Sequence, residues 1–218
     1  MSVEQSKEKN REKDAITLLR ACSGDIFYIL LAPGGPDGEL GASMRYLNQR
    51  YTMPMRELQG ILTDIGTEEL GHMEMVSALV YQLTKGLTPE QLEAQGFADY
   101  FVDHTTGIYP VSASGVPFSA ATFQSTGDAI SDLHEDLAAE QKARTTYDNI
   151  LRLADDPDVR DVIRFLRERE IVHYQRFGEG LRLLQDQLAR SPQPENPYAY
   201  NTSFDPMPRR MNRMRNSM

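Results

Sequence analysis

The amino-acid sequence predicts an all-α protein, a four-helix bundle whose two helix pairs are joined by one long crossover connection. Three observations support this fold class. Apolar residues recur every three or four positions in four long segments, which is the period of a helix with one buried face. Breakers such as Pro54, Gly86 and Pro157 separate the segments. An irregular stretch over residues 96–127, rich in Gly, Ser, Thr and aromatic residues, divides the four segments into two pairs.

The first pair of helices is expected over residues 39–51 and 55–85. A Pro- and Gly-rich run over residues 33–38 precedes the first helix and prevents an earlier start. Pro54 ends this helix, because the residue before a proline avoids the helical region. Gly86 is typical of the position just beyond a helix C-terminus. A short helix over residues 89–94 is expected before the irregular stretch, because Thr88-Pro89 is a helix-start signature.

The second pair is expected over residues 128–153 and 159–188. The turn between these helices is Asp155-Asp156-Pro157-Asp158, which places proline and acidic residues at a helix start. The chain therefore has three predicted regions: a partly helical N-terminal segment over residues 1–33, the bundle over residues 34–190, and an extended or disordered tail over residues 191–218. The tail is Pro- and Asn-rich and ends in a basic, Met-rich run.

Composition and charge narrow the function classes. The chain of 218 residues is long enough for one domain with a sizeable core. A net charge of −9 argues against a nucleic-acid partner. The apolar run over residues 26–32 is far below the roughly 20 residues that span a bilayer, and residues 1–9 do not resemble a signal peptide. Cys22 is the only cysteine, which fits a reducing compartment. We therefore expect a cytoplasmic protein with no membrane partner.

One short pattern, Glu-x-x-His, occurs twice. Glu69 precedes His72 on the second predicted helix, and Glu170 precedes His173 on the fourth. Residues three apart on a helix share a face, so each copy presents a carboxylate and an imidazole to the same point. Two such copies are part of the pattern of ferritin-like di-iron and di-manganese bundles, which also need one lone Glu from each of the other two helices. The sequence therefore predicts a ferritin-like bundle with a dinuclear metal site.

The two lone glutamates are expected to be Glu39 and Glu140, which lie on the first and third predicted helices. A buried carboxylate is costly unless it is paired or bound to a cation, and two divalent cations would neutralise several at once. Carboxylates with one imidazole per metal suit manganese or iron, and the lack of thiolate ligands disfavours structural zinc. Tyr46 lies two helical turns after Glu39 on the same face. By contrast, Glu68 and Arg169 are expected on solvated faces or in ion pairs.

The stretches around these residues resemble the manganese catalases. The likeness covers about residues 34–188 and is closest to the short, spore-coat-associated branch of that family. It rests on six motifs that combine the candidate ligands with their flanking residues: GGPDGEL (34–40), RYLNQRY (45–51), TDIGTEE (63–69), SGVPF (114–118), DLAAE (136–140) and REREIVH (167–173).

The resemblance implies a role for each candidate residue. Five residues would hold two manganese ions: Glu69 as the bridge, Glu39 and His72 on one ion, and Glu140 and His173 on the other. Two further residues would be catalytic. Glu170 resembles the family's carboxylate that moves protons without binding metal, and Tyr46 resembles a tyrosine beside the first metal's carboxylate. Family members are usually hexamers, so a homo-oligomer is expected.

The leading hypothesis is therefore disproportionation of hydrogen peroxide at two manganese ions, with no organic cofactor. A first alternative is a di-iron oxidase or ferroxidase, in which Glu170 would be a metal ligand. A second alternative is a non-catalytic spore-coat component that keeps the metal for stability. Its partners would be coat proteins, and the basic tail over residues 208–215 would serve as an assembly arm.

Overall fold

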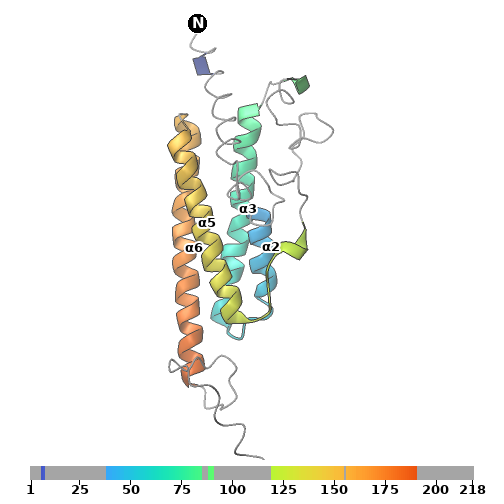
Figure 1. The fold of residues 1–218 in the computed structure, drawn as a ribbon, viewed down its shortest axis with the longest axis vertical. Coiled ribbons are helices and arrows are strands. Elements are labelled where there is room, and N and C mark those ends of the chain that lie inside the picture. The colour runs from blue at the N-terminus through green and yellow to red at the C-terminus, as the bar shows by residue number, and fades with distance from the viewer. Residues whose placement is uncertain (1–5, 8–37, 85–87, 91–118, 155, 191–218) are drawn as a thin grey trace, which may run out of the picture.

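The computed structural model describes residues 6–7, 38–84, 88–90, 119–154 and 156–190. Four long helices and one short 3₁₀ helix make up the fold: α2 (Glu39–Gln49), α3 (Arg56–Thr84), η4 (Ala120–Thr122), α5 (Ala129–Leu153) and α6 (Pro157–Arg190). These ranges contain no strand, and the long helices form an elongated bundle (Figure 1). The predicted all-α, four-helix fold is therefore confirmed.

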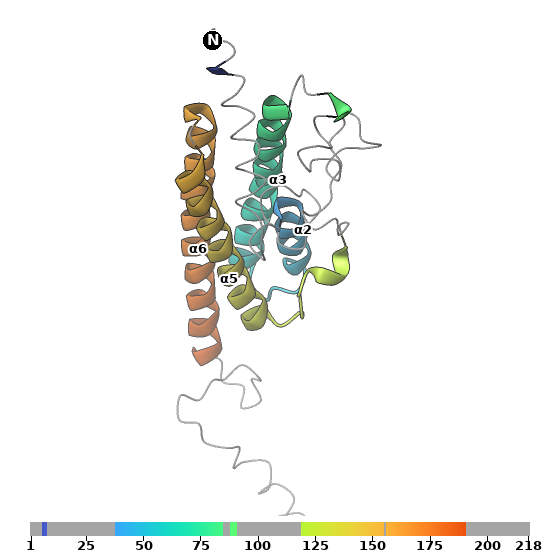
Figure 2. The ribbon, with the colours of Figure 1, turned by 45° about the horizontal axis from the view of Figure 1, so that its top comes forward.

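The helices form two antiparallel pairs. The most extensive contacts join α2 to α3 and α5 to α6. The helices α3 and α5, by contrast, run in the same direction along the bundle (Figures 1 and 2). A parallel step of this kind needs a connection that travels the length of the bundle. The crossover expected over residues 96–127 lies mostly outside the described residues. The predicted N-terminal segment, tail and short helix over 89–94 lie wholly or mostly outside them too.

Local chemistry explains where the described helices begin and end. The Asp128 side chain accepts a hydrogen bond from the Ser131 N–H at 2.8 Å and so caps α5. The helix α6 begins at Pro157, where the missing N–H costs nothing. The helix α2 ends at Gln49, two residues before the predicted end, because the Thr52 N–H turns back onto the Gln49 carbonyl.

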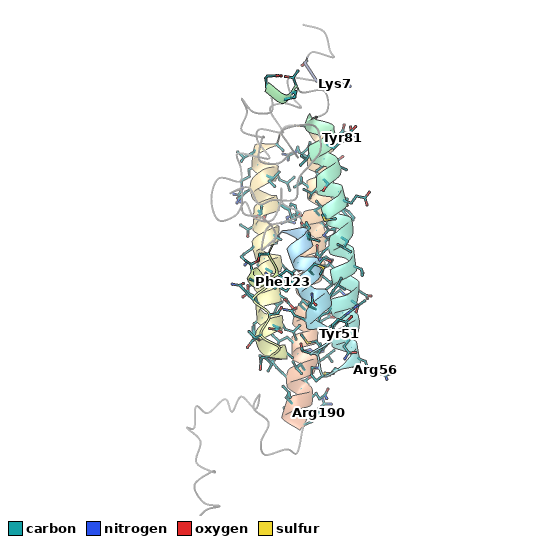
Figure 3. The ribbon with its side chains drawn as sticks, turned by 90° about the vertical axis from the view of Figure 1, so that its right-hand side faces the viewer. Lys7, Tyr51, Arg56, Tyr81, Phe123 and Arg190 are labelled. Carbon is teal, nitrogen blue, oxygen red and sulfur yellow. The ribbon has the colours of Figure 1, made fainter. Side chains whose placement is uncertain are left out.

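An apolar core occupies the half of the bundle that contains the start of α3 and the start of α5. It consists mainly of Leu58, Leu62, Ile65, Ile130, Leu133, Phe177, Leu181 and Leu184. Figure 3 shows Arg56 and Tyr81 near opposite ends of α3, with side chains along the length of the bundle. The Tyr46 ring packs edge-on against Phe177 with ring centroids 4.9 Å apart. Some core residues lie one helical turn from the polar residues described next, so packing of the core also positions those polar residues.

No described helix is both long enough and apolar enough to cross a membrane.

Candidate metal centre

All six candidate acids and histidines converge inside the bundle, and each is at most 4% exposed. They come from all four long helices: Glu39 from α2, Glu69 and His72 from α3, Glu140 from α5, and Glu170 and His173 from α6. The helical spacing explains the convergence. Glu69 follows the core residue Ile65 by one turn, and His173 precedes the core residue Phe177 by one turn.

Glu69 lies between the two imidazoles. Its Oε2 atom is 2.7 Å from Nδ1 of His72, and its Oε1 atom is 2.8 Å from Nδ1 of His173. The two rings stack with centroids 5.4 Å apart and an angle of 19° between their planes. Each oxygen of one carboxylate therefore faces a different imidazole. This is the arrangement expected of a carboxylate that bridges two cations.

Two further glutamates, Glu140 and Glu170, approach the same Nδ1 atoms of the two histidines. Glu140 Oε2 lies 3.5 Å from His173 Nδ1, and Glu170 Oε1 lies 3.6 Å from His72 Nδ1. Ligand atoms from both Glu-x-x-His motifs lie within 4.8 Å of one another. The structure thus places Glu170 as close to one imidazole as Glu140 is to the other.

Two buried tyrosines bind the two lone glutamates. The Tyr46 hydroxyl donates to Glu140 Oε1 at 2.5 Å, and the Tyr147 hydroxyl donates to Glu39 Oε1. The expected place of Tyr46, beside Glu39, is therefore wrong. Seven residues of helix rise about 10 Å, so Tyr46 reaches across to α5 instead of along its own helix.

Tyr147 is the residue of the site that the sequence analysis missed. The signal was present, because Tyr147 follows Glu140 by seven residues just as Tyr46 follows Glu39. Since α2 and α5 run in opposite directions, each tyrosine meets the glutamate of the other helix.

Two carboxylates of the site, Glu39 and Glu170, have raised pKa values. Burial, followed by the charge of Glu69, raises the pKa of Glu39 well above its usual range. Burial also raises the pKa of Glu170, and the charges of Glu140, Glu69 and Glu39 add to the effect. Burial and the nearby negative charges disfavour the ionised forms of both carboxyl groups, and a bound cation would offset this effect.

Glu69 and His173 shift in the directions expected of an ion pair. Burial raises the pKa of Glu69, but hydrogen bonds with His173 and His72 outweigh it and lower the pKa. Burial lowers the pKa of His173, but hydrogen bonds with Glu140 and Glu69 raise it to about 11. In the absence of metal, a proton on His173 therefore partly neutralises Glu69 and Glu140, as a bound cation would.

The residues present fit two divalent cations. Buried atoms that make no aligned hydrogen bond include Glu69 Oε1, Glu140 Oε2, Glu170 Oε1 and His173 Nδ1. Buried polar atoms without an aligned hydrogen bond are rare in folded proteins and call for an explanation such as a bound ion. A small cavity lies among Glu39, Glu69, Glu140 and Glu170. Carboxylate oxygens with one imidazole nitrogen per metal are the ligands that manganese and iron accept.

Most of the chain matches a known family. Residues 28–211 match the sequence profile of the family described as manganese containing catalase. The chain belongs to this family. The family resemblance predicted from the motifs is therefore confirmed. Protein CotJC of Bacillus subtilis is 52% identical over 160 residues, which are 73% of this chain and 84% of that relative.

A second family relative is a probable manganese catalase of Clostridium acetobutylicum. It is 37% identical over 150 residues, which are 68% of this chain and 66% of the relative. Among solved structures, the crystal structure of KatB, a manganese catalase from Anabaena, matches with a TM-score of 0.64 and 29% identity. That match covers 84% of this chain and 76% of KatB. The structural similarity confirms the predicted fold class.

Proposed function

We propose that this protein is a catalase, which converts two molecules of hydrogen peroxide into dioxygen and two molecules of water. Two manganese ions would be held by Glu39, Glu69, His72, Glu140 and His173. The observation that carries the proposal is the placement of the Glu69 carboxylate, with one oxygen toward each imidazole, in a buried site. Membership of the manganese-containing catalase family supports both the metal and the reaction.

Two manganese ions bound here would supply the two-electron redox change that disproportionation requires. The protein's own contribution is to fix ligands and to handle protons. Glu69 would bridge the ions, since its oxygens face opposite imidazoles. Tyr46 and Tyr147 would hold Glu140 and Glu39 in place, because each hydroxyl donates to one oxygen and restrains the carboxylate.

Glu170 would carry protons in the reaction. Oxidation of one peroxide to dioxygen releases two protons, and reduction of a second peroxide to water consumes two. A carboxylate that takes up one of these two protons in the first half and returns it in the second would carry that proton between the halves, and the other proton would pass through water. Burial and the neighbouring carboxylates raise the pKa of Glu170 above its usual range, so that this group holds a proton more readily than an ordinary carboxylate does.

Substitution of Glu170 by Gln tests this role, because the amide keeps the volume and cannot carry the proton. We expect Glu170→Gln to retain two manganese ions and to lose about 10²-fold or more in the rate of dioxygen release. Glu168→Gln is a matched control, since Glu168 is an exposed acid two residues away on the same helix. Full activity together with full metal content in Glu170→Gln would rule out the proton-carrying role.

One observation favours the first alternative, a di-iron oxidase. Glu170 Oε1 lies 3.6 Å from His72 Nδ1 and belongs to the same cluster of possible ligand atoms. On that alternative Glu170→Gln would lose a metal ion. Protein grown with both metals would contain iron and would release no dioxygen from peroxide. Elemental analysis and a dioxygen electrode on one sample separate the two enzymes.

The non-catalytic spore-coat component stays a prediction, as do the homo-oligomeric state and the cytoplasmic location. A protein that binds two manganese ions and turns over no peroxide would favour the coat component.

A further inference from the structure

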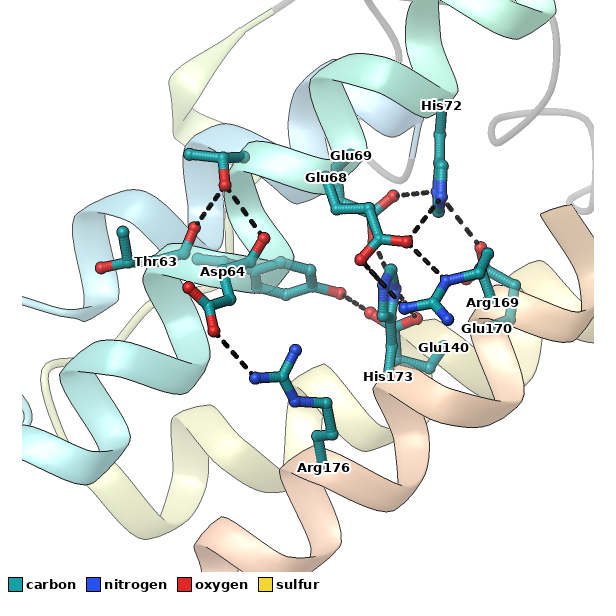
Figure 4. Close-up of polar contacts among 12 residues, drawn as sticks. Thr63, Asp64, Glu68, Glu69, His72, Glu140, Arg169, Glu170, His173 and Arg176 are labelled. Atoms are coloured by element: carbon teal, nitrogen blue, oxygen red, sulfur yellow. Dashed lines mark hydrogen bonds and ion pairs between the residues drawn. The ribbon is translucent and has the colours of Figure 1, made fainter.

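The Glu68 carboxylate lies on the opposite side of the two imidazoles from Glu69. Its Oε1 atom is 3.5 Å from Nε2 of His72, and its Oε2 atom is 3.2 Å from Nε2 of His173. The Nδ1 atoms of both rings face Glu69 instead. Figure 4 shows Glu68 beside both rings and the side chain of Arg169. One carboxylate therefore contacts the outer nitrogen of both histidines, with one oxygen for each.

Arg169 holds this carboxylate in place. Its Nε atom donates to Glu68 Oε1 at 2.5 Å, and its Nη2 atom donates to Oε2 at 3.1 Å. Two parallel bonds of this kind fix the plane of the carboxylate as well as its position. Glu68 directly precedes Glu69 on α3, and Arg169 directly precedes Glu170 on α6. The ion pair thus joins the two Glu-x-x-His helices at the level of the metal centre.

We propose that Glu68, held by Arg169, is a positioning residue for both metal-binding histidines. It fixes each imidazole in the tautomer that carries its proton on Nε2, so that each Nδ1 presents a lone pair to one metal ion. This inference rests on the metal site of the proposed function. It extends that site to a residue that does not contact the metals.

The physical basis is the two-sided chemistry of imidazole. A neutral ring carries one proton, and the partner of one nitrogen decides which nitrogen remains free for a metal. Neither Nε2 makes an aligned hydrogen bond among the described residues, and Glu68 is the carboxylate whose two oxygens lie within 3.5 Å of the two Nε2 atoms, one oxygen for each. When Glu68 is lost, its partner Arg169 is left at least 29% exposed, and a protonated His173 keeps Glu69 and Glu140 as its partners. The effect of this loss on the metals is therefore separable from an effect on folding.

Manganese binding to the metal-stripped protein provides the main test, measured by competition with a chelating indicator. We expect Glu68→Ala to weaken the binding of both ions by about 10- to 100-fold, the range typical of residues that orient metal ligands. Glu68→Gln should recover part of the loss, because the amide oxygen still accepts a hydrogen bond. Glu74→Ala, an exposed acid on the same helix, should bind as the wild type does. Wild-type affinity for both ions in Glu68→Ala would overturn the proposal.

The melting temperature distinguishes positioning from a structural role. Without metal, we expect Glu68→Ala to have nearly the same melting temperature as the wild type. When metal is added, its melting temperature should rise by less than that of the wild type. An equal loss in both states would overturn the proposal. Arg169 acts through Glu68, so Arg169→Ala should weaken manganese binding in the wild type and have no further effect in Glu68→Ala. Additive losses of affinity would overturn the part of the proposal in which Arg169 acts by holding Glu68.

Dioxygen release by the wild type, measured on the same samples, keeps this inference distinct from the proposed function. If the wild type binds two ions but releases no dioxygen, the proposed function is wrong and this inference still stands. If the wild type is active and its Glu68→Ala variant binds metal normally, this inference is wrong and the proposed function still stands.

Discussion

Two buried tyrosines control the orientation of the lone glutamates. Tyr46 donates to Glu140 and Tyr147 donates to Glu39, and neither ring is more than 1% exposed. Burial raises the pKa of both phenols, followed by the charge of Glu140 for Tyr46 and of Glu39 for Tyr147, so both remain hydrogen-bond donors. The Tyr46 bond occupies Oε1 of Glu140 and leaves Oε2 without an aligned hydrogen bond, 3.5 Å from Nδ1 of His173. The hydroxyl thereby selects which oxygen is left for a cation.

Substitution of Tyr46 by Phe removes this donor and leaves a buried carboxylate less well satisfied. We expect Tyr46→Phe to lower the free energy of unfolding of the metal-stripped protein by about 1–3 kcal/mol, measured by urea denaturation. Tyr51→Phe is the control, since Tyr51 is 74% exposed, and it should change stability by less than about 0.5 kcal/mol. Equal stability of the two variants would show that the Tyr46 bond contributes nothing.

The residues of the site differ in how well the sequence predicts them. Glu69 and His72 follow from spacing within one helix, which sequence alone reveals. Tyr46 was assigned to the wrong glutamate, because its partner depends on how far α5 is displaced along α2. Glu68 was assigned to a solvated face or an ion pair. The ion pair is confirmed, but only the position of α6 brings His173 to the same carboxylate.

At the scale of elements, Gly66 is the glycine of α3 that lies closest to the neighbouring helix α2. A Cβ atom at Gly66 would lie 2.9 Å from Cγ and 3.3 Å from the backbone N of Leu47. Ser43 donates to the Gly66 carbonyl at 2.6 Å across the same interface. This close contact holds the middle and end of α2, the helix that carries Glu39, against the helix that carries Glu69.

Two glycine substitutions on α3 isolate the effect of this contact. Gly66→Ala should lower the free energy of unfolding by about 1–3 kcal/mol, because the added methyl group overpacks the interface. Gly60→Ala should raise it by up to about 1 kcal/mol, since nothing lies within 4 Å of a Cβ atom there and Ala favours a helix. Thermal or urea denaturation measures both. A stabilised Gly66→Ala would mean that Leu47 moves aside easily.

The helices themselves were predictable to within two residues at each end, because their limits depend on local signals. Pro157 at the start of α6 and Asp128 before α5 are such signals. The close approach at Gly66 was not predictable in this way. From sequence alone, a glycine inside a helix indicates only lower helix stability, and its packing role becomes visible once the neighbouring helix is placed.

At the scale of the whole molecule, four helices converge on like charges that two cations would neutralise. Binding of metal to the folded state alone stabilises it by mass action. At a free metal concentration 100 times the dissociation constant, each ion adds about 2.7 kcal/mol. For a domain of this size, the two ions together should raise the melting temperature by about 10–20 °C. Calorimetry before and after chelation measures the rise, and unchanged melting would contradict a metal centre that links all four helices.

The pH dependence of the metal-stripped protein follows from the same charges. Between about pH 6.5 and 9, folded His173 keeps its proton, because its pKa is raised to about 11, whereas the unfolded imidazole loses it near its ordinary pKa of about 6.5. The folded state then binds more protons, so stability falls as the pH rises, by at most about 1.4 kcal/mol per pH unit for this group. Glu39 and Glu170, with raised pKa values, act in the same direction. Glu69, with a lowered pKa, is ionised in both states here and adds no slope.

Urea denaturation of chelated protein at several pH values measures this slope. His173→Gln should reduce it, and His134→Gln, at an exposed position on α5, should leave it unchanged. The metal-loaded protein should lack the His173 contribution, because a metal at Nδ1 takes the place of the proton. If the chelated protein became more stable as the pH rose through this window, His173 would not be the protonated partner of Glu69 and Glu140, and metal would not be replacing a proton at the centre of the bundle.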